Sequence, residues 1–132
     1  MSENAKNITR AENSQLERKQ VMNIIGGEKR GSKLALCASK AVRPTAQRTR
    51  EALFNILQGG RFSLSLSEAT VIDLFAGTGA IGLEALSRGA RNCVFVEQDQ
   101  DALQTLQANI SKLNLEDCAH ILAKDARQID NW

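Results

Sequence analysis

Between residues 70 and 89, a short apolar run leads into three closely spaced glycines and then into a helical pattern. The run TVIDLF is rich in β-branched residues, and Gly77, Gly79 and Gly82 satisfy the spacing GxGxxG. The pattern AIGLEALSR follows and stops at Gly89, a residue type common at helix C-termini. Such a loop lets backbone N–H groups approach a ligand closely at the start of a helix. The sequence therefore predicts a ligand site between a strand and a helix.

The rest of the second half continues to alternate strands and helices. We expect strands at Thr70–Phe75, Asn92–Glu97 and Ala119–Ala123, and helices at residues 80–88 and Asp101–Leu113. The order β-α-β-α-β favours an open, mostly parallel sheet with right-handed crossovers, which is the doubly wound α/β class.

The first half has a different pattern. Residues 1–20 are polar and lack apolar periodicity, so we expect a disordered or frayed tail. Val21–Ile25 and Leu34–Cys37 predict a hairpin with a basic turn, and a helix should run from Ala46 to about Leu57 with Thr45 as its N-cap. The expected apolar face of that helix consists of Thr49, Ala52, Leu53, Ile56 and Leu57. We therefore place one domain over residues 21–132, with the hairpin and helix at 21–60 and the strand and helix alternation at 69–132.

Acidic residues stand at the ends of the three predicted strands. They are Asp73, Glu97 and Asp125. Parallel strands bring their carboxyl ends to one edge of the sheet, where open α/β sheets bind ligands. Glu97 follows Gly77 by 20 positions, where a carboxylate can accept hydrogen bonds from ribose hydroxyls. Each carboxylate alone could simply end a strand, but the set together with the glycines indicates a binding site.

The position of Asp73 bears on which ribose-containing ligand the loop accepts. NAD would place a pyrophosphate against the glycine turn, and a carboxylate four residues ahead of Gly77 would repel it. S-adenosylmethionine has no phosphate and carries an ammonium and a sulfonium, which a carboxylate favours. The loop therefore predicts S-adenosylmethionine, with a nicotinamide-dependent oxidoreductase as the alternative.

The net charge of +2 hides an asymmetry between the two halves. Residues 1–70 carry 12 Lys+Arg against 6 Asp+Glu, whereas residues 71–132 carry 5 against 9. A basic front segment can attract a polyanion, although an ordinary solvated surface would give the same counts. The chain has no apolar run near the roughly 18 residues of a membrane span and starts without an apolar signal core. We expect a cytoplasmic protein with neither a membrane partner nor a metal.

Several segments resemble bacterial small-subunit ribosomal RNA guanine-N2 methyltransferases of the RsmD type. The resemblance covers roughly residues 22 to 130 and is carried by MNIIGGEKRGSKL, by RPT-x2-R-x-RE-x-LFN-x-L after it, by DLFAGTGAIGLEALSRGA and by VEQD. It implies a Rossmann-like class I methyltransferase fold, here with only the first three strands after the N-terminal hairpin and helix. It also implies S-adenosylmethionine as cofactor, and ribosomal RNA or a small-subunit assembly particle as partner.

The resemblance assigns roles to individual residues. Asp73, Gly77 and Gly79 would line the methionine end of the cofactor, Glu97 would hold the ribose and Asp125 would lie by the adenine. Phe75 would belong to the same cofactor site. The basic residues Lys29, Arg30, Arg43 and Arg48 would face RNA phosphates, with packing and local ion pairing as the alternative for Arg43 and Arg48.

One segment of the family pattern does not occur. Family members hold the guanine with an Asn/Asp-Pro-Pro-Tyr/Phe segment after a fourth strand, but Pro44 is the sole proline here and there is no tyrosine. We therefore expect a C-terminally truncated chain that is inactive alone, or a non-catalytic RNA-binding module. A strand TVIDLF without its family neighbour would also expose an apolar edge, which favours self-association.

Overall fold

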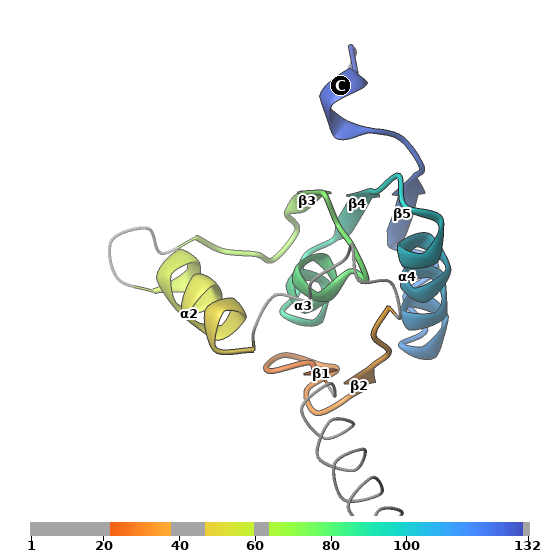
Figure 1. Ribbon diagram of the computed structural model, residues 1–132. Helices are drawn as coiled ribbons and strands as arrows, with labels where there is room; N and C mark the ends of the chain where they lie inside the picture. The colour runs from red at the N-terminus through yellow and green to blue at the C-terminus, as the bar shows by residue number, and fades with distance from the viewer. Residues whose placement is uncertain (1–21, 38–46, 60–63, 131–132) are drawn as a thin grey trace, which may run out of the picture.

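The computed structural model describes residues 22–37, 47–59 and 64–130 (Figure 1). Its elements, in chain order, are β1 (Met22–Asn23), β2 (Lys33–Leu34), α2 (Gln47–Gln58), β3 (Thr70–Leu74), α3 (Ala80–Ser87), β4 (Asn92–Val96), α4 (Gln100–Lys112), β5 (Ala119–Leu122) and a 3-10 turn at Ala126–Gln128. This order confirms the predicted hairpin, helix and alternating strands and helices. The expected tail at 1–20, the N-cap Thr45 and Arg43 lie outside the described residues.

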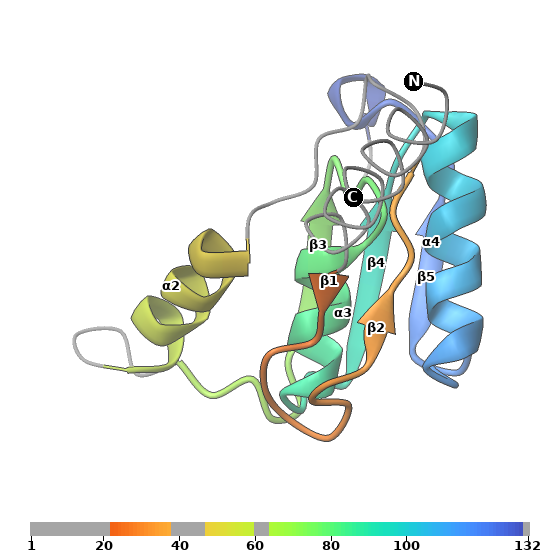
Figure 2. The ribbon, with the colours of Figure 1, turned by 60° about the horizontal axis from the view of Figure 1, so that its bottom comes forward.

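The central sheet is parallel, with strand order β3-β4-β5. Thr70 pairs with Asn92 at one end of β3 and Leu74 pairs with Val96 at the other, while β4 continues the register onto β5. Helices α3 and α4 cover the same face of the sheet, as Figures 1 and 2 both show. The predicted open parallel α/β fold is therefore confirmed.

Close contact between α3 and β4 explains one glycine of the loop pattern. A Cβ atom at Gly82 would come within 2.3 Å of the Phe95 ring and 2.7 Å of the Cys93 sulfur. Phe95 and Cys93 are fully buried and share the core with Leu83 of α3 and Leu106 of α4. Gly82 thus serves the packing of the helix on the sheet rather than contact with a ligand.

The buried face of α2 differs from the one that we expected. Arg50 and Phe54 are its buried residues, whereas Thr49, Ala52 and Ile56 are exposed, Ile56 by 57%. Leu53 and Leu57 are half-buried. The predicted face was wrong because it was built from the less polar residues alone and left out Arg50, which has an ion-pair partner inside the protein. That partner rotates the inward face of the helix toward Arg50 and Phe54.

The hairpin β1–β2 packs beside α3 and α4, on the side away from the sheet (Figures 1 and 2). Met22 pairs with Leu34 in antiparallel fashion, and Met22, Ile24 and Leu34 are buried in the core. Its turn is fastened to the end of α3, because the Glu28 N–H donates to the Ser87 carbonyl at 2.8 Å. In the described ranges, no helix has the length and apolarity needed to cross a membrane.

Candidate functional site

The glycine loop between β3 and α3 is a closed β-turn. Gly77 takes the first central position with φ of 59°, and the Gly79 N–H donates to the Ala76 carbonyl at 2.9 Å. Gly79 has φ of 91° and lies so close to α4 that a Cβ atom would come within 2.4 Å of Leu106. Gly77 is therefore needed for the conformation of the turn, and Gly79 for both that conformation and the close packing against α4.

Asp73 lies at the C-terminal end of β3 with only 9% of its surface exposed. Its carboxylate accepts a hydrogen bond from the Gly82 N–H at 3.0 Å, in the first turn of α3. Burial raises the pKa of Asp73 to about 6, and the Gly82 hydrogen bond opposes that shift. Among the described residues Asp73 has no ion pair, so its charge at neutral pH is compensated only by the helix end.

Glu97 connects the end of β4 to the glycine loop. One carboxylate oxygen accepts the Gly77 N–H at 2.7 Å, and the other accepts the N–H groups of Gln98 and Asp99, both at 2.9 Å. Glu97, the residue predicted to hold a ribose, and Gly77 of the predicted loop are thus in direct contact. Phe75, with φ of 57°, lies beside them and is 65% exposed. A large aromatic side chain at the mouth of a loop offers a surface for a planar ligand.

Asp125 follows β5 at the same carboxyl edge of the sheet, but its contacts are with Arg127. The Arg127 guanidinium donates two hydrogen bonds to the carboxylate, at 3.0 and 2.8 Å, and the Arg127 N–H donates a third at 3.0 Å. These bonds hold the pKa of Asp125 below its ordinary value. Arg127 was absent from the predicted site, although an arginine two residues after a strand-ending acid was a readable signal.

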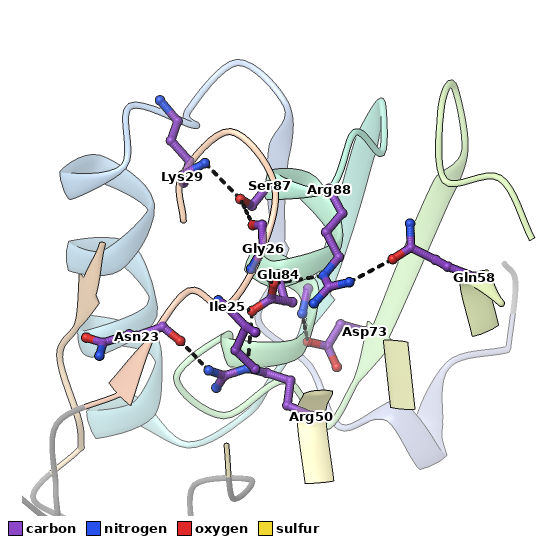
Figure 3. Close-up of polar contacts among 11 residues, drawn as sticks. Asn23, Ile25, Gly26, Lys29, Arg50, Gln58, Asp73, Glu84, Ser87 and Arg88 are labelled. Carbon is purple, nitrogen blue, oxygen red and sulfur yellow. Dashed lines mark hydrogen bonds and ion pairs between the residues drawn. The ribbon is translucent and has the colours of Figure 1, made fainter. Parts of the chain in front are cut away.

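Glu84 is a buried charged residue that the sequence patterns did not single out (Figure 3). It is fully buried in α3, and its carboxylate accepts the N–H groups of Ile25 and Gly26, both at 2.9 Å. It also pairs with Arg50 at 3.3 Å and with Arg88 at 2.9 Å. The available signal was an acid in the middle of an apolar helical pattern, because a buried charge needs partners.

The two arginines extend this network to the hairpin and to α2 (Figure 3). Arg50 donates to the Asn23 carbonyl in β1, and burial lowers the pKa of its guanidinium while Glu84 opposes the shift. Arg88 donates to the Gln58 side chain at 2.8 Å, and its guanidinium lies 4.8 Å from the centre of the Phe54 ring. The network therefore joins the hairpin, α2 and α3 around one carboxylate.

Two of the predicted RNA-facing residues, Lys29 and Arg30, lie away from the glycine loop. Lys29 is half-buried and Arg30 is exposed in the hairpin turn, and the Lys29 N–H donates to the Ser87 hydroxyl at 2.9 Å. Ser87 ends α3, which starts at the glycine loop, so the turn and the loop are at opposite ends of that helix (Figure 2). Arg48 is exposed on the first turn of α2.

No metal centre emerges from this geometry. Within residues 22–37, 47–59 and 64–130, no three His, Cys, Asp or Glu side chains gather closely enough to hold a metal ion. The site consists instead of a glycine turn with three carboxylates at the ends of adjacent parallel strands.

Known proteins are similar to this chain in sequence and in fold. The family described as Conserved hypothetical protein 95 matches residues 22–132 of the chain. Ribosomal RNA small subunit methyltransferase D of Escherichia coli is 44% identical over 92 residues, which are 70% of this chain and 44% of that protein. The solved structure of the Escherichia coli protein yhhF has a TM-score of 0.68 at 37% identity, over 80% of this chain and 53% of that one.

A more distant solved structure shares the fold alone. It is an RNA methyltransferase from Salinibacter ruber in complex with S-adenosyl-L-homocysteine, 19% identical, with a TM-score of 0.56 over 67% of this chain and 54% of that one. Taken together, the parallel sheet, the glycine turn and these neighbours define a Rossmann-like class I methyltransferase fold.

Within that fold class, the sequence comparison identifies one family. The chain belongs to the family described as Conserved hypothetical protein 95, the RsmD family, as the resemblance predicted. It spans about half the length of the curated relatives that it matches.

Proposed function

We propose that this chain forms the cofactor-binding part of an S-adenosylmethionine-dependent enzyme that methylates the exocyclic amine, N2, of a guanine in small-subunit ribosomal RNA. The observation that carries the proposal is the hydrogen bond from Gly77 to Glu97, which joins the glycine turn to a ribose-type acceptor on the next strand. Membership of the family supports the reaction class.

The residues present fit this cofactor chemically. Asp73 is buried without a cation among the described residues, so the ammonium of the methionine moiety would supply the missing positive charge. Glu97 retains carboxylate lone pairs that can accept hydrogen bonds from ribose hydroxyls. Asp125 could accept a hydrogen bond from the adenine amine once the Arg127 guanidinium has moved off its carboxylate. S-adenosylmethionine supplies a methyl group on a sulfonium, while Gly77, Gly79 and Phe75 shape the loop around it.

The basic residues would bind the RNA. Lys29, Arg30 and Arg48 are accessible enough to contact phosphates, and Arg43 belongs to the same proposal although it lies outside the described residues. Because the hairpin turn and the glycine loop are at opposite ends of α3, we expect the RNA to run along this side of the domain. Naked ribosomal RNA and a small-subunit assembly particle both have the required phosphates.

Methyl transfer also requires a group that holds the guanine amine in line with the methyl. The Asn/Asp-Pro-Pro-Tyr/Phe segment that would do so does not occur in these 132 residues, since Pro44 is the sole proline. We therefore propose that the chain binds cofactor without turning it over alone. The same observation favours the second candidate, a non-catalytic RNA-binding module.

Self-association is a further part of the proposal. Ile72 and Leu74 are large apolar residues exposed on β3, and in the described part of the sheet β3 is an edge strand. Sedimentation velocity at several protein concentrations tests whether chains pair through this edge.

A calorimetric titration with S-adenosylmethionine, with NAD as control ligand, tests the main proposal. We expect saturable binding of S-adenosylmethionine only. Asp73→Asn keeps an acceptor for the Gly82 N–H but removes the charge, so it should weaken binding by about tenfold or more. Binding of NAD with no binding of S-adenosylmethionine would contradict the proposal.

A further inference from the structure

Asn109 is a buried polar residue in the interior of α4 that the proposed function does not use. Only 1% of its surface is exposed. Its side-chain oxygen accepts the Ala35 N–H at 2.7 Å, and its side-chain nitrogen donates to the Ala35 carbonyl at 3.1 Å and to the Thr78 carbonyl at 3.0 Å. One amide thus bridges the segment after β2 and the glycine loop.

The chemistry of this position requires an amide. An asparagine side chain has one acceptor and two N–H donors, and the three bonds use both donors and the oxygen. Asparagine is a poor residue for a helix interior, and a buried amide is costly unless its hydrogen bonds are made. A leucine at position 109 would fill a similar volume but would leave three backbone groups unsatisfied.

The hydrogen bond to the Thr78 carbonyl fixes the orientation of one peptide of the loop. The peptide between Thr78 and Gly79 is held on one side by Asn109, and on the other by the hydrogen bond from the Gly79 N–H to the Ala76 carbonyl. The peptide between Ala76 and Gly77 is held by Glu97, which accepts the Gly77 N–H. Asn109 and Glu97 therefore fix the first and the third peptide of the turn that would face the cofactor.

The hairpin has a second attachment that does not involve the loop. Ser87 accepts the Lys29 N–H at 2.9 Å and donates to the Gly26 carbonyl at 2.6 Å, at the far end of α3. Both Asn109 and Ser87 fasten the same hairpin with side-chain bonds to its backbone. Only Asn109 also touches the glycine loop.

We propose that Asn109 is a positioning residue for the cofactor loop, and that it couples the shape of this loop to the segment that follows β2. This inference rests on the proposed binding of S-adenosylmethionine at the loop. It assigns Asn109 no contact with the cofactor, because the residue acts through the Thr78 carbonyl.

The test compares Asn109→Leu with Ser87→Ala in the full chain. Both variants lose hairpin bonds and should lower the melting temperature, but Asn109→Leu alone should weaken S-adenosylmethionine binding, by about tenfold at temperatures where both are folded. Ser87→Ala should stay within about twofold of the wild type. Folded Asn109→Leu protein with wild-type affinity would overturn the inference.

A measurement on the unaltered protein keeps the inference testable if Asn109→Leu does not fold. Hydrogen exchange is followed with and without S-adenosylmethionine, and the Ala35 amide, which donates to Asn109, should exchange more slowly in the complex. The Ile24 amide, which donates to Ser32 within the hairpin, is the internal reference and should not change. An unchanged Ala35 amide would overturn the inference alone, whereas wild-type protein that binds no S-adenosylmethionine would overturn the proposed function as well.

Discussion

Two buried carboxylates, Glu84 in α3 and Asp73 in β3, are placed in the same core but are neutralised in different ways. Glu84 accepts two backbone N–H groups and pairs with Arg50 and Arg88. Asp73 accepts one N–H, from Gly82, and has no cationic side chain among the described residues. Glu84 is thus a completed structural centre, whereas Asp73 has a charge that a ligand can compensate.

The comparison separates stability from binding. A carboxylate with all its partners inside the protein fixes elements against one another, and removing it leaves buried cations without a counter-charge. A carboxylate with an incomplete set of partners destabilises the unliganded protein and favours a cationic ligand. The following predictions test this division, from the largest expected effect to the smallest.

Glu84→Gln should cause the largest loss of stability. The glutamine keeps the size of the side chain but leaves Arg50 buried without a counter-charge, so the free energy of unfolding should fall by about 3–5 kcal/mol. Urea denaturation followed by circular dichroism measures this. The matched control is Glu68→Gln, because Glu68 pairs with Arg91 at 3.7 Å on the surface and should matter by less than about 1 kcal/mol. Equal losses of unfolding free energy in Glu84→Gln and Glu68→Gln would contradict the view that Glu84 is a structural centre.

Asp73→Asn should have the opposite effect on the unliganded protein. The folded-state pKa of Asp73 is raised to about 6, above its ordinary value of 3.8, so the folded state binds the proton more tightly than the unfolded state. The stability that comes from this proton is complete below pH 3.8 and is lost as the pH rises to about 6. Above that pH the asparagine variant should be more stable than the wild type by about 1–3 kcal/mol.

The pH profile of this difference is the decisive measurement. Urea denaturation at several pH values between 4 and 8 should show the advantage of Asp73→Asn shrinking toward the acid end. S-adenosylmethionine affinity of the wild type should also fall below about pH 6, as Asp73 becomes protonated. A variant that is less stable than the wild type at pH 7.5 would mean that Asp73 is a structural residue like Glu84.

Arg30→Ala should alter RNA binding without altering cofactor binding. Arg30 is exposed in the hairpin turn, so it can contribute one phosphate contact and its loss should reduce the slope of log affinity against log salt by about one. Filter binding or fluorescence anisotropy at several salt concentrations measures the slope. Lys124→Ala, at an exposed lysine after β5, is the control, and an equal effect there would indicate non-specific attraction.

Arg127→Ala should have the smallest effect. The guanidinium occupies both oxygens of Asp125, so its removal should free that carboxylate for the adenine amine and strengthen S-adenosylmethionine binding by a few-fold at most. Calorimetry of the variant beside the wild type measures the change. Weaker binding would show instead that Arg127 itself contacts the cofactor.

The sequence predicted the fold well because local signals agreed. The β-branched run before the glycines identified β3, the helical spacing around Leu106 identified α4, and the parallel sheet followed from the order of the elements. The glycine turn and Glu97 were also singled out, because both residue types have a known place in such loops, but the hydrogen bond between Gly77 and Glu97 was not predicted.

The interior network could not be predicted in the same way. Hydrophobic periodicity assigns Arg50 to the surface, and nothing near it in the sequence indicates that Glu84 will meet it in the core. Asn109 escaped for the same reason, since its role depends on backbone groups that only the folded chain brings near. Arg127 differs, because its partner Asp125 lies only two residues before it in the sequence. Local patterns identify elements, whereas partners across the fold decide which polar residues are buried.

The length of α3 has a consequence for the choice of substrate. Its eight residues, at a rise of about 1.5 Å each, separate the glycine loop from the hairpin turn by a rigid spacer of about 12 Å. Under the proposed function, a phosphate held by the turn and a base presented to the loop would therefore have to match one fixed separation in the bound RNA. An RNA with the right target nucleotide but a different local shape would fail this geometric requirement, so the proposed enzyme would select its substrate by shape as well as by base.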